Sequence, residues 1–414
     1  MNARTPGAEA PPAPPSGAAL HLDLPPPIAA LREEVRAFAD EAIAPVAAHH
    51  DRTGEFPWAN VRAMAGRGWF GIPFPEAYGG LGLGALGLAV AVEELARVDA
   101  SHAITVGAHT SLGATPIHLF GTEEQRRRWL PDLASGARLA GFGLTEPQAG
   151  SDAGGTRTRA AETDGGWTLT GGKVFITNGG VGEVFVVTAV TDPGRGANGI
   201  SAFVIEKGTP GFRAGKKEDK LGWRASDTSE LVFDDARVPA DHLLGARGAG
   251  FKQFLQVLDG GRIGIGAFSL GLAVGACEAS LRRARTREQF GRPIAEFQAV
   301  SFTLADMATR IEAGRHMVWH AARLRDAGRP YAREAAMAKL FCSELAMWAT
   351  TQAVQIHGAE GYTTRHPVER MMRDAKICEI GEGTSEIQRI VIAREELRRA
   401  AAASGGAARD PVIR

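Results

Sequence analysis

The sequence predicts an α+β chain with an N-terminal helical domain (28–140), a small middle β-domain (141–248) and a C-terminal helical bundle (249–398). Three observations support this prediction. Apolar residues recur at helical spacing in the first and last parts. Short β-type runs, separated by turn residues, fill the middle part. The 414 residues are enough for two or three packed domains or layers.

Helical spacing is clear in the first part. Leu31, Val35 and Phe38 recur on one side of a helical pattern. Further along, Thr122 is followed three residues later by Gln125, which predicts a capping box at the start of another helix. This part is therefore expected to form a helical layer.

The middle part changes to strands and the last part returns to helices. Val184–Val190 and Ser201–Glu206 are typical of strands, and the Gly171–Gly172 pair predicts a tight hairpin turn. A long helical pattern over Glu334–Gln355 ends before Gly358, a residue suited to a helix C-terminus. The order is thus helices, β-domain, helical bundle.

Composition excludes several classes of protein. Lysine plus arginine equal aspartate plus glutamate at 47 each, so no net charge favours nucleic acid or an anionic membrane. The three cysteines are isolated, which predicts core thiols and no metal site. No uninterrupted apolar run reaches the ~20 residues of a membrane span. We expect tails at 1–27, disordered because it is rich in proline, and at 399–414. The expected location is the bacterial cytoplasm, or the mitochondrial matrix if the source is eukaryotic.

Two motifs in the middle part could hold a cofactor. The turn 141–152 (GFGLTEPQAGSD) is rich in glycine and hydroxyl groups, which suits a polar or anionic cofactor; an ordinary connection is the alternative. In the segment 167–180, Phe175 and Thr177 are expected on one face of a strand, where they could stack on a flavin and hydrogen-bond to it. The alternative is that Phe175 packs in the core.

Three motifs in the last part carry charge. Asp259 and Arg262 lie three residues apart on a helix, as an ion pair or a joint ligand clamp. Arg287 and Arg292 flank an exposed turn that could reach a pyrophosphate. In 379–389 (EIGEGTSEIQR), Ser385 and Gln388 predict a capping box, with Glu382 in the turn just before the helix. Each motif also has an ordinary structural explanation, such as a carboxylate that answers the helix dipole.

Taken together and in this order, the motifs resemble those of the acyl-CoA dehydrogenase family. GLTEPQAGSD and GEGTSEIQR are similar to diagnostic segments of that family, and the resemblance covers roughly residues 28 to 398. It implies a middle domain of β-barrel type and a C-terminal domain of four-helix-bundle type. It also implies an FAD-dependent enzyme that converts an acyl-CoA thioester into the trans-2-enoyl-CoA, with short-chain and branched-chain members most similar in motif.

The resemblance implies a role for each motif residue. Glu382 is the expected base, which takes the α-proton while hydride passes to flavin N5. The expected FAD-binding residues are Phe142, Leu144, Thr145, Ser151, Phe175, Ile176, Thr177, Arg287, Phe290, Gln298, Gln355, Ile356, His357, Gly358, Ala359, Thr384, Ser385 and Glu386. The expected acyl-CoA-binding residues are Ser151, Asp259, Arg262 and Gly383.

Further expectations concern the partners of the chain and the positions at which its sequence differs from that of the family. The segment 355–359 would serve the FAD of a neighbouring subunit, which implies a homotetramer or dimer, and the electron acceptor would be electron-transfer flavoprotein. Phe175 stands where the family commonly has tryptophan, and Gly381 where it often has tyrosine. Gly261 occupies the position of the base in some branches and has no side chain, which leaves Glu382. An oxidase or monooxygenase, or a nucleic-acid-binding flavoprotein without activity, is the alternative on this fold.

Overall fold

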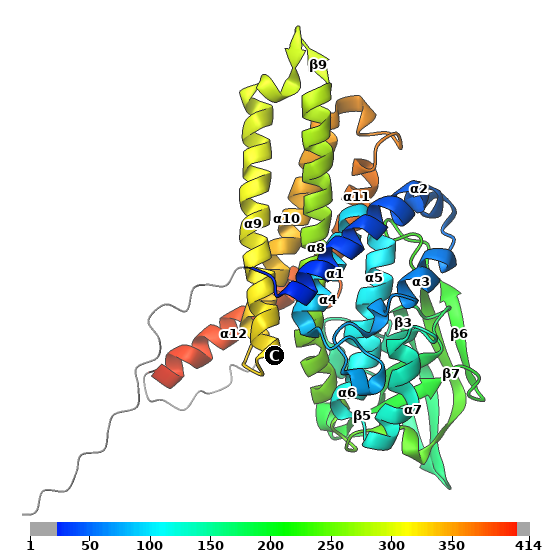
Figure 1. Ribbon diagram of the computed structural model, residues 1–414. Helices are drawn as coiled ribbons and strands as arrows, with labels where there is room; N and C mark the ends of the chain where they lie inside the picture. Colours follow the sequence, from blue (N-terminus) through cyan, green and yellow to red (C-terminus); the bar gives the residue numbers. More distant parts are fainter. Residues whose placement is uncertain (1–22, 404–414) are drawn as a thin grey trace, which may run out of the picture.

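The computed structural model describes residues 23–403, and the predicted order of helices, sheet and helices is confirmed (Figure 1). The expected disorder of 1–22 and the end of the second tail, 404–414, lie outside the described residues. Pro26 and Pro27 of the first tail belong to the first helix instead, and residues 399–403 of the second tail belong to the last helix.

The N-terminal part is a layer of short helices around the buried helix α4. Leu31, Val35 and Phe38 are all buried, as their spacing predicts. The Thr122 hydroxyl accepts from Gln125 N–H at 3.2 Å and the Gln125 side chain accepts from Thr122 N–H at 3.0 Å, so the capping box is confirmed. The helices are α1 (Pro26–Phe38), α2 (Ala44–Thr53), α3 (Trp58–Ala65), α4 (Gly84–Val98), α5 (Ala100–Ala108), α6 (Thr115–Phe120) and α7 (Glu123–Ala134), with π-helical turns at Ala39–Ile43 and His109–Ala114.

The middle part is an eight-stranded mixed sheet in the order β6-β7-β3-β2-β4-β5-β8, with β1 parallel to β4. Phe185, Phe203 and Leu231 are among the residues that fill its core. The strands are β1 (Ala140–Gly143), β2 (Arg159–Thr163), β3 (Gly166–Thr177), β4 (Val184–Val190), β5 (Ile200–Glu206), β6 (Phe212–Lys217), β7 (Thr228–Pro239) and β8 (Leu243–Leu244).

The hairpin turn predicted at Gly171–Gly172 is wrong. Both glycines lie inside β3, which pairs along its length with β7, and the ladder shifts register between Leu169 and Gly171. Gly171 has a φ of 139°, and a Cβ there would lie 2.8 Å from the backbone of Thr158. The glycine therefore serves a bulge and a close approach of strands, which the sequence signal alone does not separate from a turn.

The C-terminal part is helical; α8 and α9 pack on α4, and α10 packs on α8 and α9. In Figure 1, α8, α9 and α10 run side by side, and a small hairpin of β9 (Glu288–Gln289) and β10 (Arg292–Pro293) lies at the end remote from the sheet. The helices are α8 (Gly250–Thr286), α9 (Gln298–Asp326), α10 (Ala332–His357), α11 (Val368–Ala375) and α12 (Ser385–Ala403).

Helix α8 is long and apolar enough to cross a membrane by length and composition alone. Of its most apolar stretch, however, 83% is buried inside the protein. Its burial against α4 and α10 accounts for the apolar sequence, because a helix that is apolar on all sides is typical of a core position.

Candidate functional site

The site is centred on the short turn that carries Glu382. This turn links the 3-10 helix Lys376–Glu379 to α12, and both Glu382 (φ 53°) and Gly383 (φ 93°) have left-handed backbones. For a residue other than glycine such a conformation costs about 1–3 kcal/mol and persists where the surroundings enforce it. At Gly383 the positive φ favours glycine, and a Cβ there would lie 2.7 Å from Gln388 Nε2, which would have to move.

The capping box predicted at Ser385 and Gln388 is wrong by one residue. Helix α12 already begins at Ser385, and the hydroxyl of Thr384 accepts from the N–H of Ile387 at 3.3 Å. The hydroxyl of Ser385 is buried and has no partner among the described residues. Gln388 does not cap the helix; its side-chain amide donates to the carbonyl of Gly383 at 2.8 Å. Because a threonine stands next to a serine, the sequence alone does not decide which of the two hydroxyls caps the helix.

The Glu382 side chain is half-buried, and one oxygen of its carboxylate is held out of water without a direct partner. Its Oε2 atom is buried and has no hydrogen-bond partner among residues 23–403. Burial raises the pKa of Glu382 to about 7, although the charges of Lys339 and Arg262 act in the opposite direction. A carboxyl with a pKa near the working pH is suited to act as a general base.

Two buried cations lie near this carboxylate. Lys339, on α10, is fully buried and its Nζ donates to the Gly383 carbonyl at 2.8 Å. Arg262, on α8, forms an ion pair with Asp259, as the spacing of these residues predicts. The N–H of Gly383 finds no acceptor among the described residues, so it is available to a ligand.

Gly261 faces Glu382 across the site. A Cβ built on Gly261 would lie 2.2 Å from Glu382 Oε2 and 3.1 Å from Leu112 Cδ2. The carboxylate therefore occupies the space that any side chain at residue 261 would need. Gly381, in contrast, has room for a side chain, because its Cβ would meet only the Ile377 carbonyl at 3.4 Å and Ile377 Cγ1 at 3.9 Å.

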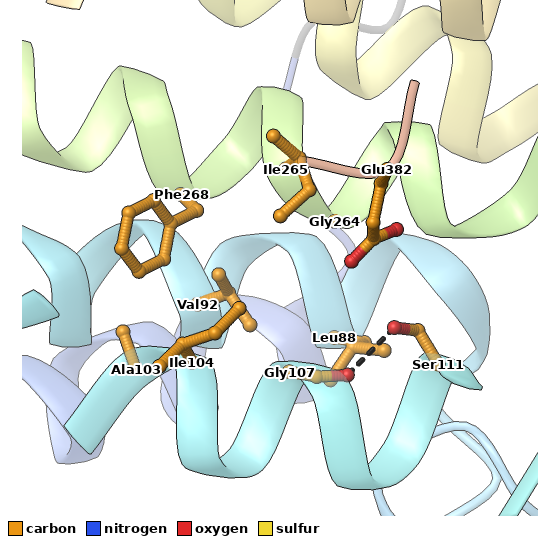
Figure 2. A pocket seen from close by; sticks show the side chains of 10 residues that line it. All are labelled: Leu88, Val92, Ala103, Ile104, Gly107, Ser111, Gly264, Ile265, Phe268 and Glu382. Carbon is orange, nitrogen blue, oxygen red and sulfur yellow. Dashed lines mark hydrogen bonds between the residues drawn. The ribbon is translucent and has the colours of Figure 1, made fainter. Parts of the chain in front are cut away.

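A narrow apolar cavity leads away from the carboxylate between α4, α5 and α8. Figure 2 shows Glu382 and Ser111 at one end and Phe268 and Ala103 at the other. The Ser111 hydroxyl donates to the Gly107 carbonyl, four residues earlier, at 2.6 Å. Glu382 is the charged residue of the lining. The lining comprises Leu88, Val92, Ala103, Ile104, Gly107, Ser111, Gly264, Ile265, Phe268 and Glu382. This arrangement suits a short apolar chain with a reactive polar end beside Glu382.

The two motifs of the β-domain are joined by a buried ion pair that the sequence analysis missed. Lys173 Nζ, in β3, donates to Glu146 Oε1 at 2.7 Å and to the Leu144 carbonyl at 3.3 Å. Glu146 also accepts the N–H groups of Arg157 and Thr158. The lysine lies within the motif KVFITN, where a charged residue flanked by strand residues could have indicated a buried partner.

The other site residues predicted in the β-domain lie in the two motifs that this ion pair connects. Phe175 is 64% exposed with a φ of 60°, so the alternative of core packing is wrong, whereas Ile176 is 3% exposed. Phe142 stacks on Phe254 of α8, with ring centroids 4.1 Å apart. The carbonyl of Thr145 accepts from Val174 N–H at 2.9 Å. Thr177 ends β3 half-buried, and Ser151 is exposed in the turn.

A second group of predicted residues lies at the opposite end of the bundle (Figure 1). Arg287, Gln298 and Phe290 belong to or flank the β9–β10 hairpin and are exposed; Phe290 is 94% exposed with a φ of 52°. The segment from Gln355 to Ala359 ends α10 nearby, since His357 and Thr286 line one cavity. Within one chain, these residues do not meet Glu382. Thr384 and Glu386 flank the start of α12, next to the Glu382 turn.

No group of three or more His, Cys, Asp or Glu side chains within the described part of the chain could hold a metal ion. The charges that act on Glu382 are those of Lys339 and Arg262, and Arg262 is paired with Asp259. Sequence reasoning did not single out Lys339. Its place on the apolar stripe of α10, four residues after the buried Ala335, is the signal that could have revealed it.

Comparisons with known proteins agree with this geometry. Family models described as the N-terminal, middle and C-terminal domains of acyl-CoA dehydrogenase match residues 27–137, 141–236 and 248–397. A probable acyl-CoA dehydrogenase of Bacillus subtilis is 52% identical over 369 residues, which cover 89% of this chain and 97% of that protein.

Two solved structures are also similar. Butyryl-CoA dehydrogenase of Megasphaera elsdenii is 45% identical with a TM-score of 0.90, over 91% of this chain and 100% of that one. A chain in a structure described as the electron transferring flavoprotein of Acidaminococcus fermentans is 48% identical with a TM-score of 0.90, over 91% of this chain and 99% of that one. The chain belongs to the acyl-CoA dehydrogenase family, a family of oxidoreductases.

Proposed function

We propose that this chain is an FAD-dependent acyl-CoA dehydrogenase that converts an acyl-CoA thioester into the trans-2-enoyl-CoA, with Glu382 as the base. The observation that carries the proposal is the Glu382 carboxylate, with one buried, unpartnered oxygen, at one end of an apolar cavity. The similarity to butyryl-CoA dehydrogenase supports an acyl-CoA substrate. Phe268, a bulky side chain at the end of the lining remote from Glu382, supports a short or branched acyl chain.

The chemistry follows from the weak acidity of the α-proton of a thioester. A carboxylate can remove this proton only if the developing negative charge on the carbonyl oxygen is stabilised, and one preorganised donor contributes about 3–4 kcal/mol. The N–H of Gly383, which has no acceptor in the described chain, is the proposed donor. Glu382, whose pKa burial raises to about 7, then receives the α-proton. Asp259 and Arg262 are proposed to contact the acyl-CoA.

The family match implies a flavin, and we propose FAD. The fit rests on Phe175, an aromatic side chain that is 64% exposed at the end of β3 and can cover a flat ring. The turn after β1 is the proposed partner of the ring's polar edge, through Thr145 and Ser151, and Thr384 would complete this side. When bound, FAD accepts the hydride that leaves the β-carbon.

We also propose an oligomeric state, an electron acceptor and a location for this chain. Exposed Arg287 and Phe290, far from the β-domain of their own chain, support a homotetramer or dimer in which the hairpin binds the FAD of a neighbouring subunit. The structure described as an electron transferring flavoprotein supports such a protein as electron acceptor. We place the enzyme in the bacterial cytoplasm.

The test is anaerobic reduction of the purified, FAD-loaded protein with a panel of straight, branched and dicarboxylic acyl-CoAs. Short or branched substrates are expected to bleach the flavin and to yield the trans-2-enoyl-CoA, identified by mass spectrometry. A folded, FAD-loaded protein that no acyl-CoA reduces would overturn the proposal. Rapid reoxidation in air, faster than by electron-transfer flavoprotein, would favour an oxidase instead.

A further inference from the structure

Lys339 is a fully buried lysine that forms no ion pair with a carboxylate in the described chain. It lies on the inward face of α10, and its Nζ makes one hydrogen bond, to the Gly383 carbonyl at 2.8 Å. Burial lowers the pKa of Lys339 to about 8. Because a buried ammonium group is costly unless it is well compensated, its place beside the Glu382 turn calls for an explanation.

The carbonyl of Gly383 accepts two hydrogen bonds, one charged and one neutral. Besides Lys339 Nζ, the side-chain amide of Gln388 donates to it at 2.8 Å and also to the Glu382 carbonyl at 3.4 Å. These donors fix the peptide groups on both sides of Gly383. They thereby hold the left-handed backbone of Glu382 and Gly383, which would otherwise relax.

Charge adds a second effect, which Lys339 supplies and Gln388 does not. The charged groups that act on the Glu382 carboxylate are Lys339 from α10 and Arg262 from α8. Arg262 is engaged by Asp259 on its own helix, whereas Lys339 donates to the turn and has no carboxylate partner among the described residues. Lys339 is itself influenced by Cys378 and Glu379 of the preceding 3-10 helix and by Arg262.

We propose that Lys339 is a positioning residue for the base: its ammonium group fixes the Gly383 carbonyl, and its charge favours the ionised form of the Glu382 carboxylate. This inference rests on the proposed role of Glu382. It assigns to one lysine both the geometry and the ionisation of the base, whereas Gln388 contributes only to the geometry.

The test compares Lys339→Met with Gln388→Met, because each removes one donor to the same carbonyl and only the first removes a charge. Flavin reduction by a good acyl-CoA is followed anaerobically with the holoenzyme between about pH 5.5 and 9, and kcat/KM is plotted against pH. FAD content and circular dichroism establish that each variant is folded. If Lys339→Met does not yield a folded holoenzyme, Lys339→Gln replaces it and is interpreted in the same way.

For Lys339→Met we expect the rising limb of the profile to move up by about one pH unit or more, as removal of a nearby opposite charge predicts. At the acidic end this corresponds to at least a tenfold loss of kcat/KM, which recovers in part at high pH. Gln388→Met should lower the rate without moving the limb. A limb that stays in place in Lys339→Met, or moves equally in both variants, would overturn the inference.

Glu382→Gln, measured in parallel, separates this inference from the proposed function. If Glu382→Gln reduces its flavin at the parental rate, the role of Glu382 fails and the inference fails with it. If Glu382→Gln is inactive but Lys339→Met has the parental profile, the proposed function stands and only the role of Lys339 is refuted.

Discussion

Gly261→Ala adds one methyl group at the point where the carboxylate lies. The added Cβ would lie 2.2 Å from Glu382 Oε2, whereas ordinary contacts begin at about 3.4 Å. The carboxylate must therefore retreat by roughly 1 Å, since Leu112 Cδ2, at 3.1 Å from the same Cβ, limits movement of the methyl. A misplacement of this size can lower the rate about 100-fold, or about 2.7 kcal/mol of transition-state stabilisation.

The assay is single-turnover flavin reduction at saturating acyl-CoA under anaerobic conditions. The matched variant is Gly264→Ala, which adds the same methyl group one turn along α8, where its Cβ has only Ser111 Oγ as a neighbour, at 3.9 Å. Because Gly264 lines the cavity, this variant should affect KM more than the maximal rate. A Gly261→Ala enzyme as fast as the parent at saturation would refute the placement of the reactive carboxylate.

Three further outcomes are expected. Since the base must be ionised and burial raises the pKa of Glu382 to about 7, kcat/KM should rise with pH through about 7; a limb near pH 4.5 would show that the carboxyl is not buried in the active enzyme. Lys173→Met leaves Glu146 buried without its cation and should lower the free energy of unfolding by about 3–5 kcal/mol in urea denaturation; an unchanged midpoint would contradict the role given to this ion pair. Arg287→Ala should weaken both FAD retention and assembly by light scattering, and a fully loaded oligomer would argue against a shared FAD site.

Patterns of apolar residues predict the fold because apolar side chains are the ones that folding buries. Leu31, Val35 and Phe38 share a helical face and are all buried, and the strand at Val184–Val190 has the predicted bounds. The glycine pair at 171 and 172 was misinterpreted, because glycine marks bulges and close approaches as well as turns. Whether it closes a hairpin depends on the partner strand, which lies some 60 residues later as β7.

The candidate site was predictable as motifs but not as an arrangement. Glu382 was singled out in its turn, yet its burial depends on α8 and α10, which no local pattern connects to it. For the same reason Gly261 was recognised only as a position without a side chain, although the carboxylate fills its space. Lys339 was missed because a lone lysine in a helix ordinarily faces solvent.

The most direct test of the central claim is the rate of flavin reduction in Glu382→Gln. Glutamine preserves the size of the side chain and removes its basicity, so the variant should keep the fold, FAD and acyl-CoA binding. Anaerobic reduction by the best acyl-CoA is expected to slow by about 100- to 10,000-fold, the contribution of a general base. A variant that bleaches at nearly the parental rate would contradict the assignment of Glu382 as the base.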